Sequence, residues 1–130
     1  MILGLLSPAL LIAAAQGPPS VSWADRRAIL QALRSVVEEQ IEAPVEFVVA
    51  RLKTRGRWAF VQAEPQRPSG GRIDGARYYP GTWDNMDGLT TTAILKRTGV
   101  GWRVVEWRIG ATDAWYCSPL PGVEYDPCRP

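Results

Sequence analysis

The feature that most constrains the folding of this 130-residue chain is one stripe of aliphatic side chains at helical spacing. Ser22 is a suitable N-cap for that helix, and Asp25 places a negative charge at the positive end of the helix dipole. Pro44 predicts that the helix ends near Ala43. Because such a helix is apolar on one face only, it needs a flat partner to cover that face. The stripe consists of Ile29, Leu30, Leu33, Val36, Val37 and Ile41.

The first part of a β-sheet that could cover this helix follows the helix directly in the sequence. Residues 45–54 and 58–63 are rich in β-branched and aromatic side chains and flank a short Arg-Gly-Arg turn at 55–57, which predicts a β-hairpin. Arg51 interrupts the alternation of the first strand, which indicates either a bulge or a strand covered on both faces. We expect the second strand to end before Pro65.

A second hairpin is predicted near the C-terminus. Residues 89–97 and 102–109 flank the turn at 98–101, and the connection at 66–88 has no clear periodicity. A connection of that length is usually functional or disordered, although its aromatic residues argue against full disorder. We therefore predict the α+β class, with one long N-terminal helix packed on a curved four-stranded antiparallel sheet.

The N-terminal residues predict export. Residues 1–15 are apolar or small and end in three alanines, which is typical of a cleavable signal peptide and too short for a bilayer span. Residues 16–21 are expected to form a flexible leader, and residues 22–130 a single α+β domain. We therefore expect a periplasmic or secreted protein with no stable membrane anchor after cleavage.

Export explains the two cysteines of the chain. In an oxidising compartment an even number of cysteines favours a disulfide, and Cys117 and Cys128 are the only pair. Their spacing fits neither a CxxC redox motif nor a usual zinc site. We predict a structural disulfide that closes a C-terminal loop.

Composition excludes several classes of activity. The chain has no histidine, so it lacks the commonest general base and metal ligand, and Ser-His or Cys-His nucleophile pairs are impossible within it. Its 15 basic residues are spread along the chain with 13 acidic residues among them, for a net charge of +2. This distribution predicts solvated surface charge and no nucleic-acid partner. We expect no cofactor and no metal.

Aromatic residues in the irregular segments are the candidate binding residues. Such side chains serve as sugar-stacking platforms or as anchors of protein interfaces. We expect most of them to plug the open end of the sheet, with Trp83 or Tyr79 the first to be exposed. The tryptophans within regular elements, which are Trp23, Trp58, Trp102 and Trp107, are expected in the core or half-buried on the sheet. The candidate binding residues are Tyr78, Tyr79, Trp83, Trp115 and Tyr116.

Two groups of acidic residues are candidate sites of chemistry. Residues 84–88 offer oxygen ligands but lack the alternating ligands, flanking helices and closing Glu of an EF-hand, so ordinary turn chemistry is favoured. Asp113 with Asp84 or Asp87 would make a carboxylate pair for acid–base or glycosidic chemistry. Because Asp113 follows Thr112, we favour a helix cap or a loop brace there.

Two sequence segments resemble a group of small exported bacterial proteins of unknown function. They are the strand Trp58-Ala59-Phe60-Val61, with Pro65 and Arg67 after it, and the segment Ile109-Gly110-Ala111-Thr112-Asp113. In that group a helix, a WAFV strand and an IGxTD segment come in the same order, over about residues 25–115 here. The resemblance implies no activity, and the cysteine pair is not a feature of the group.

The predicted order of elements is also similar in outline to the cystatin-like arrangement, a relative of the NTF2-like cone with fewer helices. Inhibitory cystatins carry a Gln-x-Val-x-Gly motif at a hairpin tip, and residues 54–57 here read Thr-Arg-Gly-Arg. Cysteine-protease inhibition is therefore not expected, because a fold alone does not carry a function.

These observations favour a non-catalytic binding or accessory protein of the cell envelope or exterior. An inhibitor or immunity-type partner of a secreted hydrolase belongs to this class, and the long loop and the C-terminal loop would form its contact surface. The alternative is a small-ligand carrier or small enzyme with a pocket between helix and sheet. A deep pocket with a buried carboxylate of raised pKa favours the alternative, whereas a filled interior with an exposed aromatic patch favours the binding protein.

Overall fold

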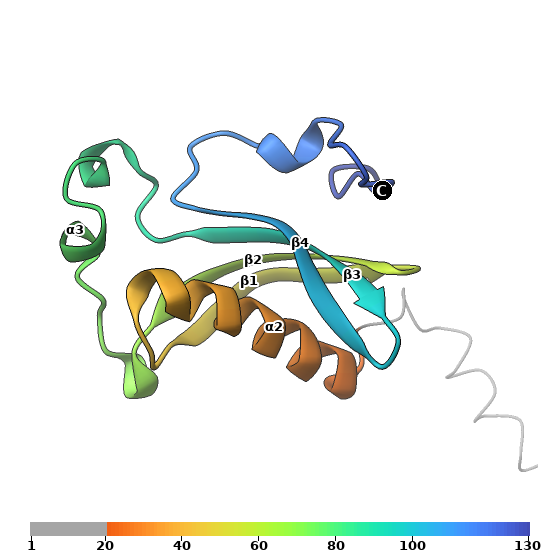
Figure 1. Ribbon diagram of the computed structural model, residues 1–130, viewed down its shortest axis with the longest axis horizontal. Coiled ribbons are helices and arrows are strands. Elements are labelled where there is room, and N and C mark those ends of the chain that lie inside the picture. The colour runs from red at the N-terminus through yellow and green to blue at the C-terminus, as the bar shows by residue number, and fades with distance from the viewer. Residues whose placement is uncertain (1–20) are drawn as a thin grey trace, which may run out of the picture.

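One long helix, α2, lies across one face of a four-stranded antiparallel sheet in the computed structural model (Figure 1). The structure describes residues 21–130. The predicted signal peptide at 1–15 and leader residues 16–20 lie outside the described residues. No helix among the described residues has the length and apolar character needed to cross a bilayer.

Helix α2 runs from Trp23 to Ile41 and begins as predicted. The Ser22 side chain caps it, with its Oγ accepting from the backbone N–H of Asp25 at 3.1 Å. The helix ends two residues earlier than the predicted Ala43, because Glu42 takes a left-handed backbone conformation with φ of 59°. Its buried residues are Ile29, Leu33, Val37 and Ile41, which belong to the predicted stripe.

The sheet has the order β1-β2-β3-β4, so each strand pairs with its neighbours in the chain. A register shift between Val49 and Arg51 confirms the predicted irregularity of β1 as a bulge. A second shift, between Ile94 and Leu95 on β3, was not anticipated. The four strands are β1 (Glu46–Arg55), β2 (Trp58–Gln66), β3 (Thr91–Thr98) and β4 (Gly101–Ile109).

Strand β2 continues past Pro65, contrary to the prediction. Pro65 pairs with Phe47 of β1, whereas β3 pairs with β2 only as far as Ala63. Pro65 therefore lies where β2 has a neighbouring strand on one side only, and a missing backbone N–H is tolerated there.

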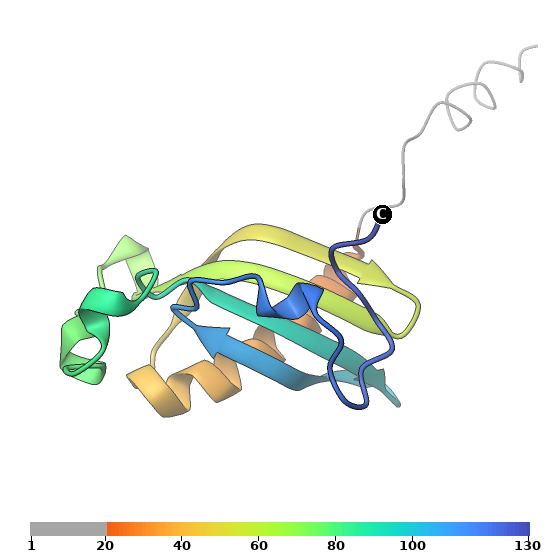
Figure 2. The same cartoon turned by 90° about the horizontal axis from the view of Figure 1, so that it is seen from above.

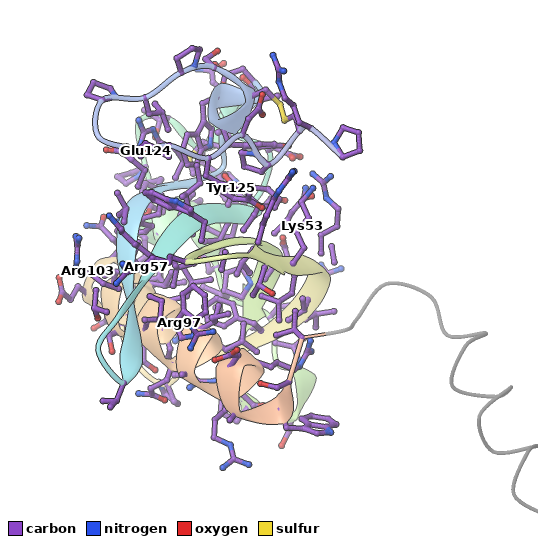
Figure 3. The ribbon with its side chains drawn as sticks, turned by 90° about the vertical axis from the view of Figure 1, so that its right-hand side faces the viewer. Lys53, Arg57, Arg97, Arg103, Glu124 and Tyr125 are labelled. Atoms are coloured by element: carbon purple, nitrogen blue, oxygen red, sulfur yellow. A yellow bond between two sulfur atoms is a disulfide. The ribbon has the colours of Figure 1, made fainter. Side chains whose placement is uncertain are left out.

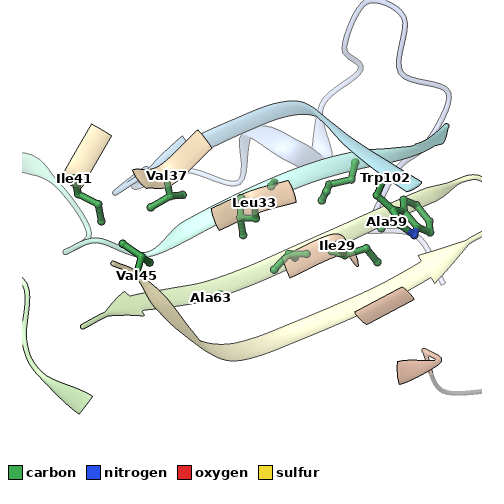
Figure 4. Close-up of a cluster of buried hydrophobic side chains, with 11 residues drawn as sticks. Ile29, Leu33, Val37, Ile41, Val45, Ala59, Ala63 and Trp102 are labelled. Carbon is green, nitrogen blue, oxygen red and sulfur yellow. The ribbon is translucent and has the colours of Figure 1, made fainter. Parts of the chain in front are cut away.

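The core lies between α2 and the sheet (Figure 4). Ala59, Ala63 and Ala93 on the two central strands are small enough to let the helix approach closely. The ring of Trp102 closes one end of this core, and aliphatic side chains fill the rest. The only buried polar residues among those described are Thr91 and Thr92. Trp23 is 80% exposed, so the prediction that it is core or half-buried is wrong. As the first helical residue it precedes the buried stripe.

The segment after β4, residues 111–130, returns over the opposite face of the sheet, and we call it the tail (Figure 2). Cys117 and Cys128 form the predicted disulfide, with their Cα atoms 5.4 Å apart. The expected cap by Thr112 or Asp113 is not formed. The short turn η4 (Trp115–Cys117) follows Ala114 and has no side-chain cap.

The connection between β2 and β3 consists of short turns. These are η2 (Pro68–Gly70), α3 (Gly75–Tyr78) and η3 (Trp83–Asn85). Arg67 fixes the start of the connection to the end of α2. Its guanidinium donates to the backbone carbonyls of Ile41 and Glu42 at 3.1 and 2.7 Å, and to that of Pro44 at 3.0 Å. The bonds to Ile41 and Glu42 satisfy carbonyls that a helix C-terminus leaves without partners.

Candidate binding surface

A row of side chains crosses all four strands near the hairpin turns, on the face opposite α2. The pairing register places Arg55 opposite Trp58, Trp58 opposite Lys96, and Lys96 opposite Arg103. Trp58 precedes Ala59, which is in the helix-facing core, so alternation puts this row on the other face. At a strand spacing of about 4.8 Å the row spans about 14 Å. We call Arg55, Trp58, Lys96 and Arg103 the cation row.

The tail occupies the β1 end of this surface. Arg55 donates to the carbonyl oxygen of Pro130 at 2.8 Å, and the ammonium of Lys53 donates to the carbonyl oxygen of Pro127. The ring of Tyr125 stacks on Trp58, with centroids 6.2 Å apart and planes inclined by 13°. The cations of β1 are therefore engaged by the protein itself.

The β4 end of the row is different. The side chains of Lys96 and Arg103 make no hydrogen bond or ion pair with any residue between 21 and 130, although the Lys96 ammonium lies 5.1 Å from the Trp58 ring centroid. The same holds for Arg57, which lies in the β1–β2 turn beside the row. Like charges directly opposite each other on neighbouring strands repel, so Lys96 and Arg103 are an unfavourable pair in the free protein. A negatively charged partner would relieve that repulsion.

The surface beside the row is hollowed. A hollow of about 450 Å³ lies between the β1–β2 turn and the tail, and Trp58 and Arg129 are among its lining residues. Arg57 and Tyr125, which also line it, are labelled in Figure 3. Two carboxylates also line the hollow. Asp126 accepts hydrogen bonds from Arg129 at 3.2 Å and from the backbone N–H of Cys128 at 2.9 Å.

The hollow keeps its positive character in spite of these carboxylates. The two carboxylates are those of Asp126 and Glu124. The cations that line the hollow, together with those of the adjoining row, outnumber them. Burial raises the pKa of Tyr125, so its hydroxyl stays neutral at physiological pH.

Two of the predicted binding residues, Trp115 and Tyr116, belong to the tail and contact the sheet face that the tail covers. Tyr116 packs on Phe60 with ring centroids 4.6 Å apart, and its hydroxyl accepts from Arg51 at 3.2 Å. The indole N–H of Trp115 donates to Thr92 Oγ1 at 2.8 Å. Both side chains are half-buried and fasten the tail to the sheet face, not to its open end.

The other three predicted binding residues lie at the far end of the molecule, beside the end of α2. The Tyr78 hydroxyl donates to Glu42 Oε1 at 2.6 Å, which with the nearby Arg77 lowers the pKa of the Glu42 carboxyl. Burial raises the pKa of Tyr79. Tyr78, Tyr79 and Trp83 are all half-buried. The structure therefore separates the five predicted residues into two groups, and the long loop and the tail do not form one surface (Figures 1 and 2).

The acidic candidates form no metal site. The described part of the chain contains no group of three or more His, Cys, Asp or Glu side chains placed to hold an ion. The backbone N–H of Asp87 donates to the Gly110 carbonyl at 2.9 Å, and its carboxylate contributes to raising the pKa of Glu64. Glu64 is thus an acidic neighbour of Asp87 that the sequence did not suggest.

The cation row is the main feature that sequence reasoning missed. Lys96 and Arg103 are equidistant from the turn at 98–101, so a simple hairpin count would have placed them opposite each other. Their approach to Trp58 depends on the pairing of β2 with β3, which no local pattern indicates.

Comparison of the whole chain with family models, with curated proteins and with solved structures found no match.

Proposed function

We propose that this chain is a non-catalytic binding protein of the periplasm or cell exterior that holds an acidic envelope or secreted protein on the cation row. The observation that carries the proposal is the contrast within the row. The tail binds the cations at the β1 end, whereas Lys96 and Arg103 make no hydrogen bond or ion pair with the described residues, and neither does Arg57 in the β1–β2 turn beside the row. An inhibitor or immunity-type protein that covers an acidic surface of a secreted hydrolase is one form of this function.

The composition of the surface supports a protein partner. Arg, Tyr and Trp are the residues that most often anchor protein interfaces, and this surface combines them on neighbouring rigid strands. Cations fixed in this way accelerate association with an acidic face and disfavour basic partners. A row about 14 Å long matches a protein face better than it matches one small ion.

The helix–sheet interior supports binding over the alternative, a carrier or small enzyme with an internal pocket. Aliphatic side chains fill that interior, and the buried polar residue on this face among those described is Thr91, which does not titrate. The Cys117–Cys128 disulfide fits an oxidising compartment, as export requires.

The test compares two triple variants that lose the same charge. Arg57→Ala/Lys96→Ala/Arg103→Ala removes the unpartnered cations of the surface. Arg26→Ala/Arg27→Ala/Arg77→Ala removes three cations elsewhere. Arg26 and Arg27 make no side-chain hydrogen bond within residues 21–130, and Arg77 makes one exposed ion pair, with Glu42. Each protein is produced from the full chain, immobilised, and used to capture proteins from an envelope extract, with elution by salt.

The expected result is that the unchanged protein and the control triple retain the same acidic protein and the surface triple loses it. With the purified partner, the surface triple should raise the dissociation constant by about tenfold or more, and less at high salt. Equal losses in both triple variants would show only non-specific charge attraction and would contradict the proposal.

A further inference from the structure

We propose that a second hollow, between the end of β2 and the connection at 66–88, binds a neutral sugar unit. The hollow measures about 360 Å³, and its lining includes Glu64, Gln66, Arg72 and Trp83. This volume falls in the range of small-molecule sites. The hollow lies at the opposite end of β2 from Trp58, so the inference is independent of the cation row. We call it the loop hollow.

The aromatic wall of the loop hollow is fixed in place. Trp83 lies against Gly75, where any Cβ atom would collide with the indole ring. The turn that carries Trp83 is closed by backbone hydrogen bonds from Asn85 to Thr82 at 2.9 Å and from Met86 to Trp83 at 3.2 Å. Because the indole is already ordered, a ligand that packs on it loses little conformational entropy. The C–H face of a pyranose ring is a suitable apolar partner for such a wall.

The polar wall offers both donors and acceptors. Glu64 Oε2 accepts one hydrogen bond, from Thr90 Oγ1 at 3.2 Å, and partial burial raises the pKa of its carboxyl, helped by the charge of Asp87. A carboxylate whose charged form is disfavoured in this way gains from additional donors. The side chains of Gln66 and Arg72 make no hydrogen bond with residues 21–130, so an amide and a guanidinium are free to bind a ligand.

The charges select the class of ligand. An anion would face Glu64 and nearby Asp87, and a cation would face Arg72. An apolar ligand would cover these polar groups without satisfying their hydrogen bonds, which is unfavourable. A neutral sugar presents hydroxyls that both donate and accept, together with an apolar ring face, and therefore complements both walls.

The test is a titration of the ¹⁵N-labelled protein, produced from the full chain, followed by NMR. The probes are the methyl glycosides of glucose, mannose, galactose and N-acetylglucosamine and the corresponding disaccharides, with glycerol as a polyol that has no ring. We expect at least one sugar to shift amide signals of residues 64–73 and 83–90 saturably, with a dissociation constant of about 10 mM or tighter. Glycerol should produce no saturable shift.

Variants distinguish sugar binding in the loop hollow from a general effect of added solute on the amide signals. Gln66→Ala/Arg72→Ala should weaken sugar binding about fivefold or more, because it removes free donors without touching Trp83. Arg57→Ala/Lys96→Ala/Arg103→Ala should leave sugar binding unchanged, so failure of one proposal does not affect the other. The inference is overturned if no probe gives saturable shifts up to about 100 mM. It is also overturned if glycerol acts as the sugars do, or if the Gln66/Arg72 variant binds normally.

Discussion

The two faces of the sheet are covered in different ways by different parts of the chain. On one face, α2 buries aliphatic side chains completely, and its main polar contact is at the edge, where Asp25 accepts from Arg97 at 3.0 and 2.8 Å. On the other face, the tail covers the fully buried Phe60 and Ile94 together with partly exposed aromatic and cationic side chains, through hydrogen bonds, ring contacts and a disulfide. The same strands supply both faces because successive side chains alternate.

The difference separates stability from recognition. Complete burial of aliphatic side chains stabilises a fold by an amount that grows with the apolar area removed from water. Partly exposed cation and aromatic contacts contribute much less each, so they can be altered without loss of the fold. We therefore expect the helix-covered face to determine folding and the tail-covered face to determine binding.

The largest expected effect comes from the helix-covered face. Leu33→Ala should lower the free energy of unfolding by about 3 kcal/mol, because the Leu33 side chain is fully buried between α2 and the sheet. Ile94→Ala removes a fully buried side chain from the tail-covered face and should cost less, about 2 kcal/mol, because the tail can move into the space. Urea unfolding followed by circular dichroism measures both values. A larger loss of unfolding free energy for Ile94→Ala than for Leu33→Ala would contradict the view that the helix-covered face contributes most to stability.

The next effect concerns the disulfide. Cys117→Ser/Cys128→Ser opens a loop with a sequence separation of 11 and should destabilise the protein by about 2 kcal/mol. Hydrogen exchange should show lost protection mainly in residues 111–130, with the amides of α2 remaining slow. Equal loss of protection in α2 would mean that the tail and the helix unfold as one unit.

A smaller effect tests one hydrogen bond of the tail. Trp115→Phe removes the indole donor of the 2.8 Å bond to Thr92, which is 6% exposed, and should cost about 1 kcal/mol more than Trp107→Phe. Trp107 is the matched control, because it is half-buried and its indole makes no hydrogen bond within residues 21–130. Equal unfolding free energies for the two variants would show that this hydrogen bond does not contribute to stability.

The smallest effect depends on pH. Hydrogen bonds from Arg97 and Trp102 lower the pKa of Asp25 in the folded protein. A lowered pKa means that Asp25 stabilises the fold above its unfolded-state pKa, and that this contribution is lost as the pH falls through the folded-state pKa. Asp25→Asn should therefore cost about 0.5 kcal/mol near pH 6 and less near pH 3. Urea midpoints that differ by the same amount at both pH values would contradict this assignment.

Local patterns in the sequence predict most of the fold. The helix follows from the Ser22 cap and the aliphatic stripe, both hairpins follow from their turns, and the disulfide follows from having two cysteines. The errors occur where a neighbour in space decides the outcome. Pro65 stays in β2 because β3 has already ended its pairing, and Trp23 is exposed because the sheet does not cover the first helical residue.

The candidate sites are less predictable, because each depends on contacts between distant segments. The sequence indicates Trp83 as a candidate binding residue. Glu64 and Gln66 line the same hollow, but they belong to β2, which ends many residues before Trp83 in the chain. The cation row requires the register between β2 and β3, which is set across the whole connection at 66–88. A single sequence contains no local signal for that register.

The bonds that hold the tail to β1 have a consequence for how this protein can change. Lys53 and Arg55 bind carbonyl oxygens of the main chain, and every residue type supplies such an oxygen. This part of the attachment therefore depends on the path of the tail, whereas Trp115, Tyr116 and Tyr125 hold the tail through their side chains. Exposed tail positions such as Ser118, Pro121 and Glu124 are free to diversify while the segment stays docked, so evolution can vary specificity there without rebuilding the scaffold.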